Sequence, residues 1–146
     1  MDKGTIISVN ISEEKGKRKH SVESVLITST GLQGDAHAGN WHRQVSLLSM
    51  ESIEKMRQAY AELSPGDFAE NLTTQGFALS EVSVGNRLRA GESILEITQI
   101  GKECHVDCEI RQKVGDCIMP IEGVFAKVIE PGRVTVGDTI EIIDIK

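Results

Sequence analysis

Residues 84–100 read VGNRLRAGESILEITQI, and this stretch indicates the fold class. Leu95 and Ile97 alternate with Glu96 and Thr98, which is the pattern of a β-strand with one apolar, buried face and one polar, solvent-exposed face. The 14 glycines are spread along the chain, and most of them separate short runs of β-branched residues. We therefore predict strands at Thr5–Ile11, Val22–Thr28, Val45–Leu48, Ile94–Ile100, Val124–Ile129 and Thr139–Ile145.

One segment, from Glu51 to Leu63, follows a helical pattern instead. Its apolar residues recur at steps of three and four, which places them on one face of a helix: Ile53, Met56, Tyr60 and Leu63. Ser49 is a suitable N-cap, and Ser64-Pro65-Gly66 would end the helix. Strands precede and follow this helix without βαβ alternation. The sequence therefore predicts a mainly β fold, a single antiparallel β-barrel with one or two short helices.

Length and composition limit the class of protein. With 146 residues, of which 39% are apolar and 26% charged, the chain can bury one core, so we expect a single domain over residues 1–146. No run approaches the ~20 apolar residues that span a bilayer, and the first residues lack a secretory signal, which predicts a cytoplasmic protein without a membrane partner. The net charge of -6 argues against nucleic-acid binding but allows a local basic pocket.

The segment from Gly31 to Arg43, GLQGDAHAGNWHR, has three glycines among polar residues and follows neither a helix nor a strand pattern. It therefore predicts a long loop, and such loops often bind ligands. Arg43 leads directly into the strand at 45–48 and is therefore held on rigid scaffold. In the alternative interpretation the glycines only make turns, the histidines are solvated and the tryptophan closes the barrel end. Three of the residues are also of metal-ligand type, but their spacing matches no metal motif: they are Asp35, His37 and His42.

A second candidate segment, GDFAENLTT at residues 66–74, follows the predicted helix. Asp67 is a typical turn residue, and Glu70 and Asn71 could likewise only turn or cap the chain. These two residues come just before an apolar strand start, however, where a side chain can be directed into a barrel mouth. We therefore treat Glu70 and Asn71 as candidate binding residues.

Three cysteines lie close together in the sequence, at Cys104, Cys108 and Cys117, which is a poor disulfide framework. With His105 they could form a zinc site of the Cys3His type, although a C-x2-C pair is missing. Alternatively, Cys108 and Cys117 are small core residues. Cys104 differs from both, because the neighbouring Lys102 and His105 would lower the pKa of its thiol and favour the reactive thiolate.

Basic residues are the remaining candidates for ligand binding. Most of them should be solvated, but two or three that converge would hold a phosphate, since arginine forks match such anions. The run KGKRKH at residues 15–20 has no interleaved aromatic residue, so we interpret it as a solvated hairpin and not as a nucleic-acid site. The candidates for a phosphate site are Arg43, Arg87, Arg89, Lys102, Arg111, Lys127 and Arg133.

Taken together, these segments resemble the MOSC domain family, which is named after the C-terminal domain of eukaryotic molybdenum cofactor sulfurase. The similarity extends from about Thr5 to Ile145, with the blocks in the family's order, and is best with small stand-alone prokaryotic members. The blocks are GDAHAG at 34–39, RQVSLL at 43–48, GDFAENLTT at 66–74, VGNRLRAGESILEITQIGKEC at 84–104, GVFAKVIEPGRVTVGD at 123–138 and the terminal TIEII.

The resemblance implies a β-barrel similar to that of pyruvate kinase, and a role in handling the molybdenum cofactor, molybdopterin with its metal. The hallmark cysteine of the family corresponds to Cys104, which would carry sulfur as a persulfide or bind molybdenum. The cofactor-binding positions that the resemblance implies are Asp35, His37, Arg43, Glu70, Asn71 and, where an arginine is expected, Lys127.

The resemblance also implies partners. The chain has no pyridoxal-phosphate cysteine desulfurase domain, so sulfur would arrive from such an enzyme or from a molybdenum-cofactor biosynthesis protein. Sulfur transfer or a molybdenum-dependent reaction would make the protein an enzyme. Two alternatives stay open, a non-catalytic carrier that delivers cofactor or sulfur to molybdoenzymes and a zinc-stabilised β domain. Cys108 and Cys117 would serve a second metal site with His105 or act as resolving thiols.

Overall fold

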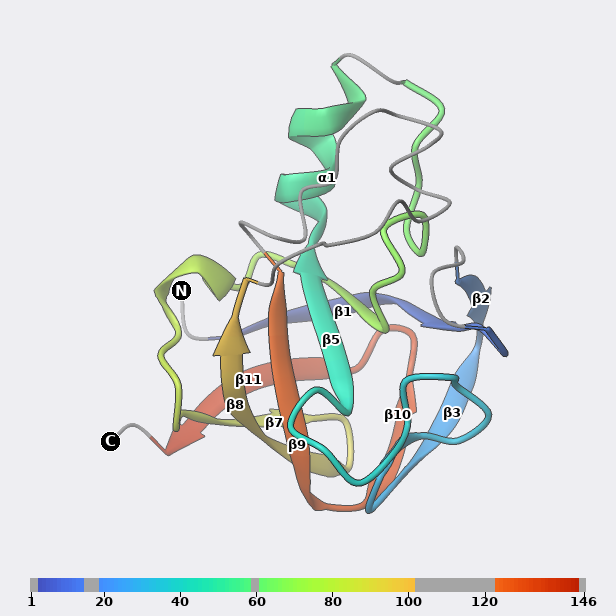
Figure 1. Ribbon diagram of the computed structural model, residues 1–146. Coiled ribbons are helices and arrows are strands. Elements are labelled where there is room, and N and C mark those ends of the chain that lie inside the picture. The colour runs from blue at the N-terminus through green and yellow to red at the C-terminus, as the bar shows by residue number, and fades with distance from the viewer. Residues whose placement is uncertain (1–2, 15–18, 59–60, 102–122, 145–146) are drawn as a thin grey trace.

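The computed structural model describes residues 3–14, 19–58, 61–101 and 123–144, which form a mainly β structure (Figure 1). The barrel strands are β1 (Lys3–Ile11), β5 (Val45–Ser49), β6 (Leu72–Gln75), β7 (Arg87–Ala90), β8 (Ser93–Ile100), β9 (Val124–Glu130) and β11 (Thr139–Asp144). Within the described residues these seven strands follow the order β11-β7-β8-β9-β5-β6-β1, and the barrel closes because β11 also pairs with β1. The predicted barrel is confirmed.

The barrel interior holds the main apolar core. Leu95 and Ile97 of β8 are fully buried, whereas Glu96 and Thr98 are partly exposed, so the alternation predicted from the sequence is confirmed. Burying one such side chain contributes roughly 1.5–3 kcal/mol to folding. Fully buried residues from the other barrel strands complete this core, among them Ile6, Leu47, Leu72, Leu88 and Ile140.

The pair β5–β6 is parallel, which is the one difference from the expected antiparallel barrel. Leu47 lies opposite Leu72 in parallel register, while the other pairs of the closed barrel are antiparallel. Parallel neighbours need a crossover connection. Helix α1 (Met50–Arg57), which stands on the end of β5 in Figure 1, begins this crossover, and the parallel pair makes the barrel mixed.

Helix α1 begins where the sequence predicts and ends earlier. Ser49 is its N-cap, and the Ser49 Oγ atom accepts a hydrogen bond from the Ser52 N–H at 3.0 Å. The helix ends at Arg57, although the apolar spacing predicted that it would reach Leu63. Leu63 is nevertheless buried, so tertiary packing satisfies the apolar pattern without the last helical turns. It belongs to a second apolar cluster of Leu48, Met50, Ile53, Leu63, Phe68 and Phe125.

Several short elements lie outside the closed barrel. Strand β2 (His20–Val22) pairs with β1, and a separate sheet has the order β10-β3-β4. The predicted strand at 22–28 is divided at Glu23 between β2 and β3. The sequence indicated the start of β6 after Asn71 but gave no bounds for β4, β6, β7 or β10, because runs of 2 or 4 residues are too short to show periodicity. The bounds are β3 Ser24–Thr28, β4 Gly31–Leu32, β10 Gly132–Thr135 and a 3-10 helix η1 at Leu79–Glu81.

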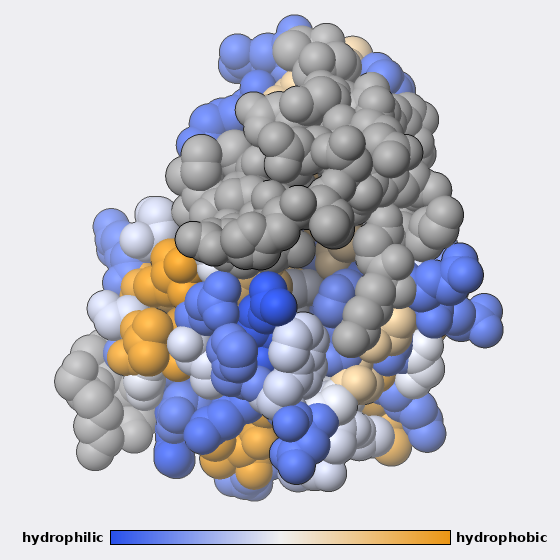
Figure 2. All heavy atoms as spheres, in the orientation of Figure 1, coloured by the Kyte–Doolittle hydropathy of each residue, from blue (hydrophilic) through white to orange (hydrophobic). Residues whose placement is uncertain are grey.

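The face of the molecule drawn in Figure 2 is mostly hydrophilic where it is coloured, and its apolar groups are small and separate. None of the helices in the described part of the chain is long and apolar enough to cross a membrane. The large apolar side chains that are exposed among the described residues are Leu26, Val84, Ile100, Val136 and Ile143.

Candidate functional site

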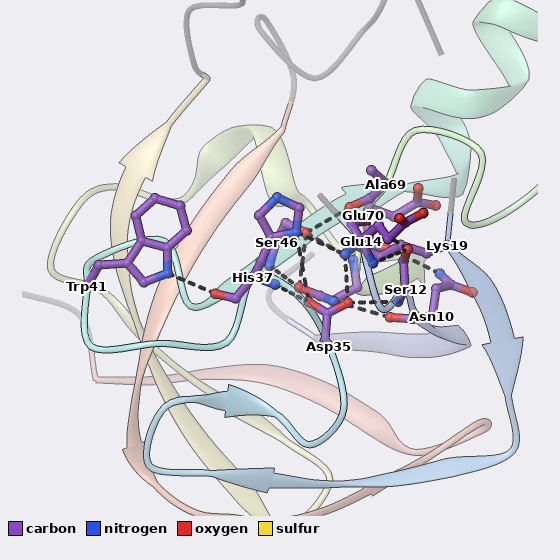
Figure 3. Close-up of polar contacts among 11 residues, drawn as sticks. Asn10, Ser12, Glu14, Lys19, Asp35, His37, Trp41, Ser46, Ala69 and Glu70 are labelled. Atoms are coloured by element: carbon purple, nitrogen blue, oxygen red, sulfur yellow. Dashed lines mark hydrogen bonds and ion pairs between the residues drawn. The ribbon is translucent and has the colours of Figure 1, made fainter. Parts of the chain in front are cut away.

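The candidate site is built on the loop at residues 33–44, which leads from β4 to β5 and packs against the end of β1 (Figure 3). Asp35 organises this loop. Its Oδ1 atom accepts hydrogen bonds from the Ser12 N–H at 2.9 Å and from Lys19 Nζ at 2.7 Å, and its Oδ2 atom accepts one from the His37 N–H at 3.1 Å. The side chains of Asp35 and Lys19 are both 0% exposed, so they form a fully buried ion pair.

Two opposing effects set the charge state of Asp35. Burial raises the pKa of its carboxyl group, because desolvation disfavours the charged form. The hydrogen bond and the positive charge of Lys19, helped by the Ser12 N–H and the Asn71 side chain, lower the pKa and outweigh burial. The pKa of Asp35 is therefore below its ordinary value, and its carboxylate is ionised at neutral pH.

His37 links this buried ion pair to the surface. Its Nδ1 atom lies 3.0 Å from Lys19 Nζ, while 24% of its side chain is exposed. The ring is nearly parallel to that of Trp41, at 5° with centroids 6.4 Å apart. The Trp41 Nε1–H donates to the His37 carbonyl oxygen at 2.8 Å, which holds the two rings in this arrangement.

Arg43 lies over the Trp41 ring, near the end of the same loop. Its guanidinium carbon is 4.7 Å from the centroid of Trp41 and 5.7 Å from that of Phe125, which are cation-π distances. The Arg43 Nε atom is buried and has no hydrogen-bond partner among the described residues. An unpaired buried donor on a cation is costly, and it marks a place where an acceptor atom would be stabilised.

His42 connects the loop to the end of β8. The Thr98 hydroxyl donates to the His42 carbonyl oxygen, and His42 Nε2 lies 2.8 Å from Gln99 Oε1. Gln99 Nε2 donates in turn to the Gly101 carbonyl oxygen at 2.8 Å. These contacts fix the His37–Arg43 part of the loop relative to Gly101, the last described residue before Cys104 in the sequence.

Glu70 is fully buried and supports the turn before β6. Its Oε2 atom accepts from the Gly66 N–H at 2.9 Å and from the Thr73 hydroxyl at 2.7 Å. Its Oε1 atom is buried without a hydrogen-bond partner among the described residues. Burial raises the pKa of Glu70, and the hydrogen bonds from Gly66 and Thr73 only partly oppose it.

Asn71 is also fully buried, and its side chain connects the turn before β6 to strands β5 and β1. Its Oδ1 atom accepts from the Ser46 N–H at 2.9 Å and from the Ser46 hydroxyl at 3.1 Å, and its Nδ2 donates to the Asn10 carbonyl oxygen at 3.2 Å. The Asn71 side chain also helps to lower the pKa of Asp35. In the described structure Glu70 and Asn71 are thus fully buried, and both bond to protein groups.

Lys19 is the residue that the sequence analysis missed. The prediction that residues 15–20 are a solvated hairpin is wrong for Lys19, whose side chain is buried on Asp35. Its N–H also donates to the Gly66 carbonyl oxygen at 2.8 Å. Nothing in the local sequence separates Lys19 from its basic neighbours, because its burial depends on residues that are distant along the chain.

The other basic candidates that the structure describes lie elsewhere on the barrel and pair with other groups. Lys127 is 3.7 Å from Glu96, and Arg87 is 3.2 Å from the same carboxylate. Arg89 is 3.7 Å from Glu141, and the guanidinium of Arg133 donates to Ser24 at 3.1 Å. Of the predicted phosphate ligands, the described structure therefore places Arg43 alone beside the His37 loop. The remaining candidates, Lys102 and Arg111, lie outside the described residues.

The residues predicted as metal ligands lie partly within and partly outside the described structure. The described residues contain no group of three His, Cys, Asp or Glu side chains that could hold a metal ion, so the combination of Asp35, His37 and His42 is not a metal site there. Cys104, Cys108, Cys117 and His105 lie outside the described residues.

A cavity of about 470 Å³ lies beside α1 and is lined by none of the predicted site residues. We place the candidate site at the His37 loop, where the buried charges and the unpaired arginine nitrogen are.

A model of the MOSC domain matches residues 34–141, which include both the loop and the turn described above. The chain belongs to the MOSC domain family. The sequence matches no curated protein.

Solved structures share the barrel of this MOSC chain. The YUAD protein from Bacillus subtilis is 18% identical, with a TM-score of 0.81 over 99% of this chain and 97% of that chain. YiiM from Escherichia coli is 21% identical, with a TM-score of 0.73 over 98% and 71%. YiiM from Geobacillus stearothermophilus is 19% identical, with a TM-score of 0.75 over 97% and 75%. At these identities the similarity concerns the fold alone.

Proposed function

We propose that this MOSC chain binds a molybdopterin-type ligand against His37, Trp41 and Arg43, and that Cys104 carries sulfur as a persulfide or holds the molybdenum. The observation that carries the proposal is Arg43, a cation held against two aromatic rings with one buried nitrogen unpaired among the described residues. Such a group is suited to an anionic ligand, because a guanidinium fork matches the geometry of phosphate oxygens.

The local charge balance supports an anionic ligand. Lys19 and Asp35 cancel each other in a buried ion pair, and burial raises the pKa of Glu70, which disfavours its charge. Among the described residues no carboxylate forms an ion pair with Arg43, although the chain as a whole carries -6. A local basic site of this kind attracts a phosphate even on an acidic protein.

The aromatic groups fit the other half of such a ligand. Trp41 and His37 present nearly parallel rings, and flat heteroaromatic molecules bind well against such surfaces. The residues present therefore fit a molybdopterin, with Arg43 for its phosphate and the Trp41 and His37 rings for its pterin. When bound, the cofactor supplies the redox-active molybdenum and the sulfur ligands that hold it.

The role of Cys104 extends this proposal beyond the described residues. Gln99 ties His42 to Gly101, and Cys104 is three positions further along the chain. The loop that carries Arg43 is thus anchored at the base of the segment that contains the cysteine. A thiolate there would serve either as the sulfur carrier, loaded by a cysteine desulfurase of the cell, or as a metal ligand.

The experiment is to purify the protein from cells that make the cofactor and to measure molybdenum, released pterin and trapped persulfide. Arg43→Ala should lose bound pterin, and Cys104→Ser should lose the persulfide or the metal. Arg87→Ala is the matched control, because that arginine pairs with Glu96 away from the site and should retain both. If wild type carries neither pterin nor molybdenum and no persulfide can be trapped on Cys104, the proposal is refuted.

A further inference from the structure

We propose that Lys19 is a positioning residue that holds His37 in the tautomer with its proton on Nε2, so that the ring presents a hydrogen-bond donor to the ligand. The identity of that ligand rests on the proposed function. The tautomer does not, because it is a property of the ligand-free chain and is measured there.

The hydrogen-bond donors and acceptors of Lys19 and His37 determine which ring nitrogen of His37 carries the proton. A lysine ammonium has three donors and no acceptor. Lys19 Nζ lies 2.7 Å from Asp35 Oδ1 and 3.0 Å from His37 Nδ1, so Nδ1 must accept while Lys19 is charged. In a neutral imidazole one nitrogen accepts and the other carries the proton, which places the proton on Nε2.

General basicity and the observed geometry both place the positive charge on Lys19 and not on His37. Lysine is intrinsically more basic than histidine by roughly four pH units. The Asp35 carboxylate is also closer to the lysine, since its Oδ1 lies 2.7 Å from Lys19 Nζ, while its Oδ2 lies 3.9 Å from His37 Nδ1. Both the intrinsic basicity and the geometry therefore favour a charged lysine beside a neutral imidazole.

The backbone holds Lys19 firmly in this position. Its N–H donates to the Gly66 carbonyl oxygen at 2.8 Å, and the Gly66 N–H donates to Glu70 Oε2 at 2.9 Å. A Cβ atom on Gly66 would overlap the Lys19 carbonyl oxygen, so the two segments touch directly. The turn that contains Glu70 thus positions Lys19, and Lys19 in turn orients His37.

The difference in exposure explains why Lys19 positions a group and does not bind ligand. The Lys19 side chain is 0% exposed, whereas 24% of the His37 side chain is exposed. The charge therefore acts at the surface through the imidazole. An Nε2–H donor on this ring selects ligand atoms that accept hydrogen bonds, such as phosphate or carbonyl oxygens.

Ring 15N NMR of histidine-labelled, ligand-free protein at neutral pH tests the tautomer directly. The signals of His37, one of four histidines, are assigned by their loss in His37→Gln. We expect an acceptor-type shift for Nδ1 and a proton on Nε2 in wild type. In Lys19→Met the Nδ1 shift should change, whereas the ring signals of His42, which contacts Gln99, should not.

The wild-type spectrum alone can refute the tautomer assignment. The proposal therefore remains testable even if the Lys19→Met protein does not fold. A proton on Nδ1 of His37 in wild type refutes the proposal. Identical His37 signals in wild type and in a folded Lys19→Met protein refute it as well.

A second measurement tests the donor role toward the ligand. His37→Phe keeps a flat ring beside Trp41 but has no donor, so pterin bound per purified chain should fall about tenfold or more. Undiminished pterin in His37→Phe overturns the donor role. If wild type binds no pterin, the proposed function fails, whereas the tautomer measured on the ligand-free chain stands.

Discussion

Replacing Lys19 with methionine tests whether the buried ion pair organises the candidate site. The substitution keeps most of the side-chain volume and removes the charge, which leaves the Asp35 carboxylate buried without its partner. Both side chains are 0% exposed and the charged atoms are 2.7 Å apart, so solvent screens this pair little. Breaking a buried pair by removing one member costs about 3–5 kcal/mol.

Lys127→Met is the matched control. Lys127 lies 3.7 Å from Glu96, but 47% of its side chain is exposed, and such surface pairs contribute about 0–1 kcal/mol. Urea unfolding at pH 7 should therefore show a much larger loss of unfolding free energy for Lys19→Met. Equal losses for the two variants would refute the reasoning.

The pH dependence gives a second check on the same pair. The folded-state pKa of Asp35 lies below its ordinary value of 3.8, so the ionised carboxylate stabilises the fold above that pH, and this contribution is lost as the pH falls through the folded-state pKa. Without Lys19, burial should raise the pKa of Asp35. Protonation of Asp35 then removes the unpaired buried charge, so the Lys19→Met protein should lose less stability at acid pH than at neutral pH. The stability difference between wild type and Lys19→Met should therefore shrink toward acid pH, and a constant difference would contradict the assignment.

Three further predictions concern the supports of the site and the helix. Gly66→Ala should destabilise the protein more than Gly85→Ala in urea unfolding, because both glycines have positive φ, at 91° and 98°, but only the Cβ at 66 would meet Lys19. Glu70→Gln should stabilise the protein increasingly as the pH rises above about 4.5, because the raised pKa of Glu70 makes its ionisation unfavourable to folding; a pH-independent effect in the same assay would exclude this. Ser49→Ala should cost about 1 kcal/mol of unfolding free energy through loss of the helix N-cap, and an unchanged denaturation midpoint would argue against that cap.

The fold was predictable where the pattern was long enough to be read. The alternation of Leu95 and Ile97 with polar, partly exposed neighbours lies in a strand of 8 residues, and the N-cap at Ser49 is a local interaction. Strands of 2 or 4 residues are too short to show a period, so no bounds could be predicted for β4, β6, β7 and β10. The parallel pairing of β5 with β6 depends on how the chain returns after α1, which no local pattern encodes.

The candidate site was predictable in its residue types and less so in their roles. Asp35, His37 and Arg43 stand out in the sequence as polar groups in a glycine-rich loop, and the structure places all three in one connected site. Glu70 and Asn71 also stand out, but their side chains hold protein groups together in the described structure. Whether a polar residue bonds to protein or to ligand depends on its neighbours in space.

By itself, the sequence determined the β-rich barrel, the position where the helix begins and the loop that carries His37 and Arg43. These follow from side-chain periodicity and from residue types that act over a few positions. Only the tertiary structure decided that the Lys19 side chain is buried and pairs with Asp35. The physical reason is that burial of a charge requires a partner at hydrogen-bond distance, and the fold supplies that partner from a loop distant in the sequence.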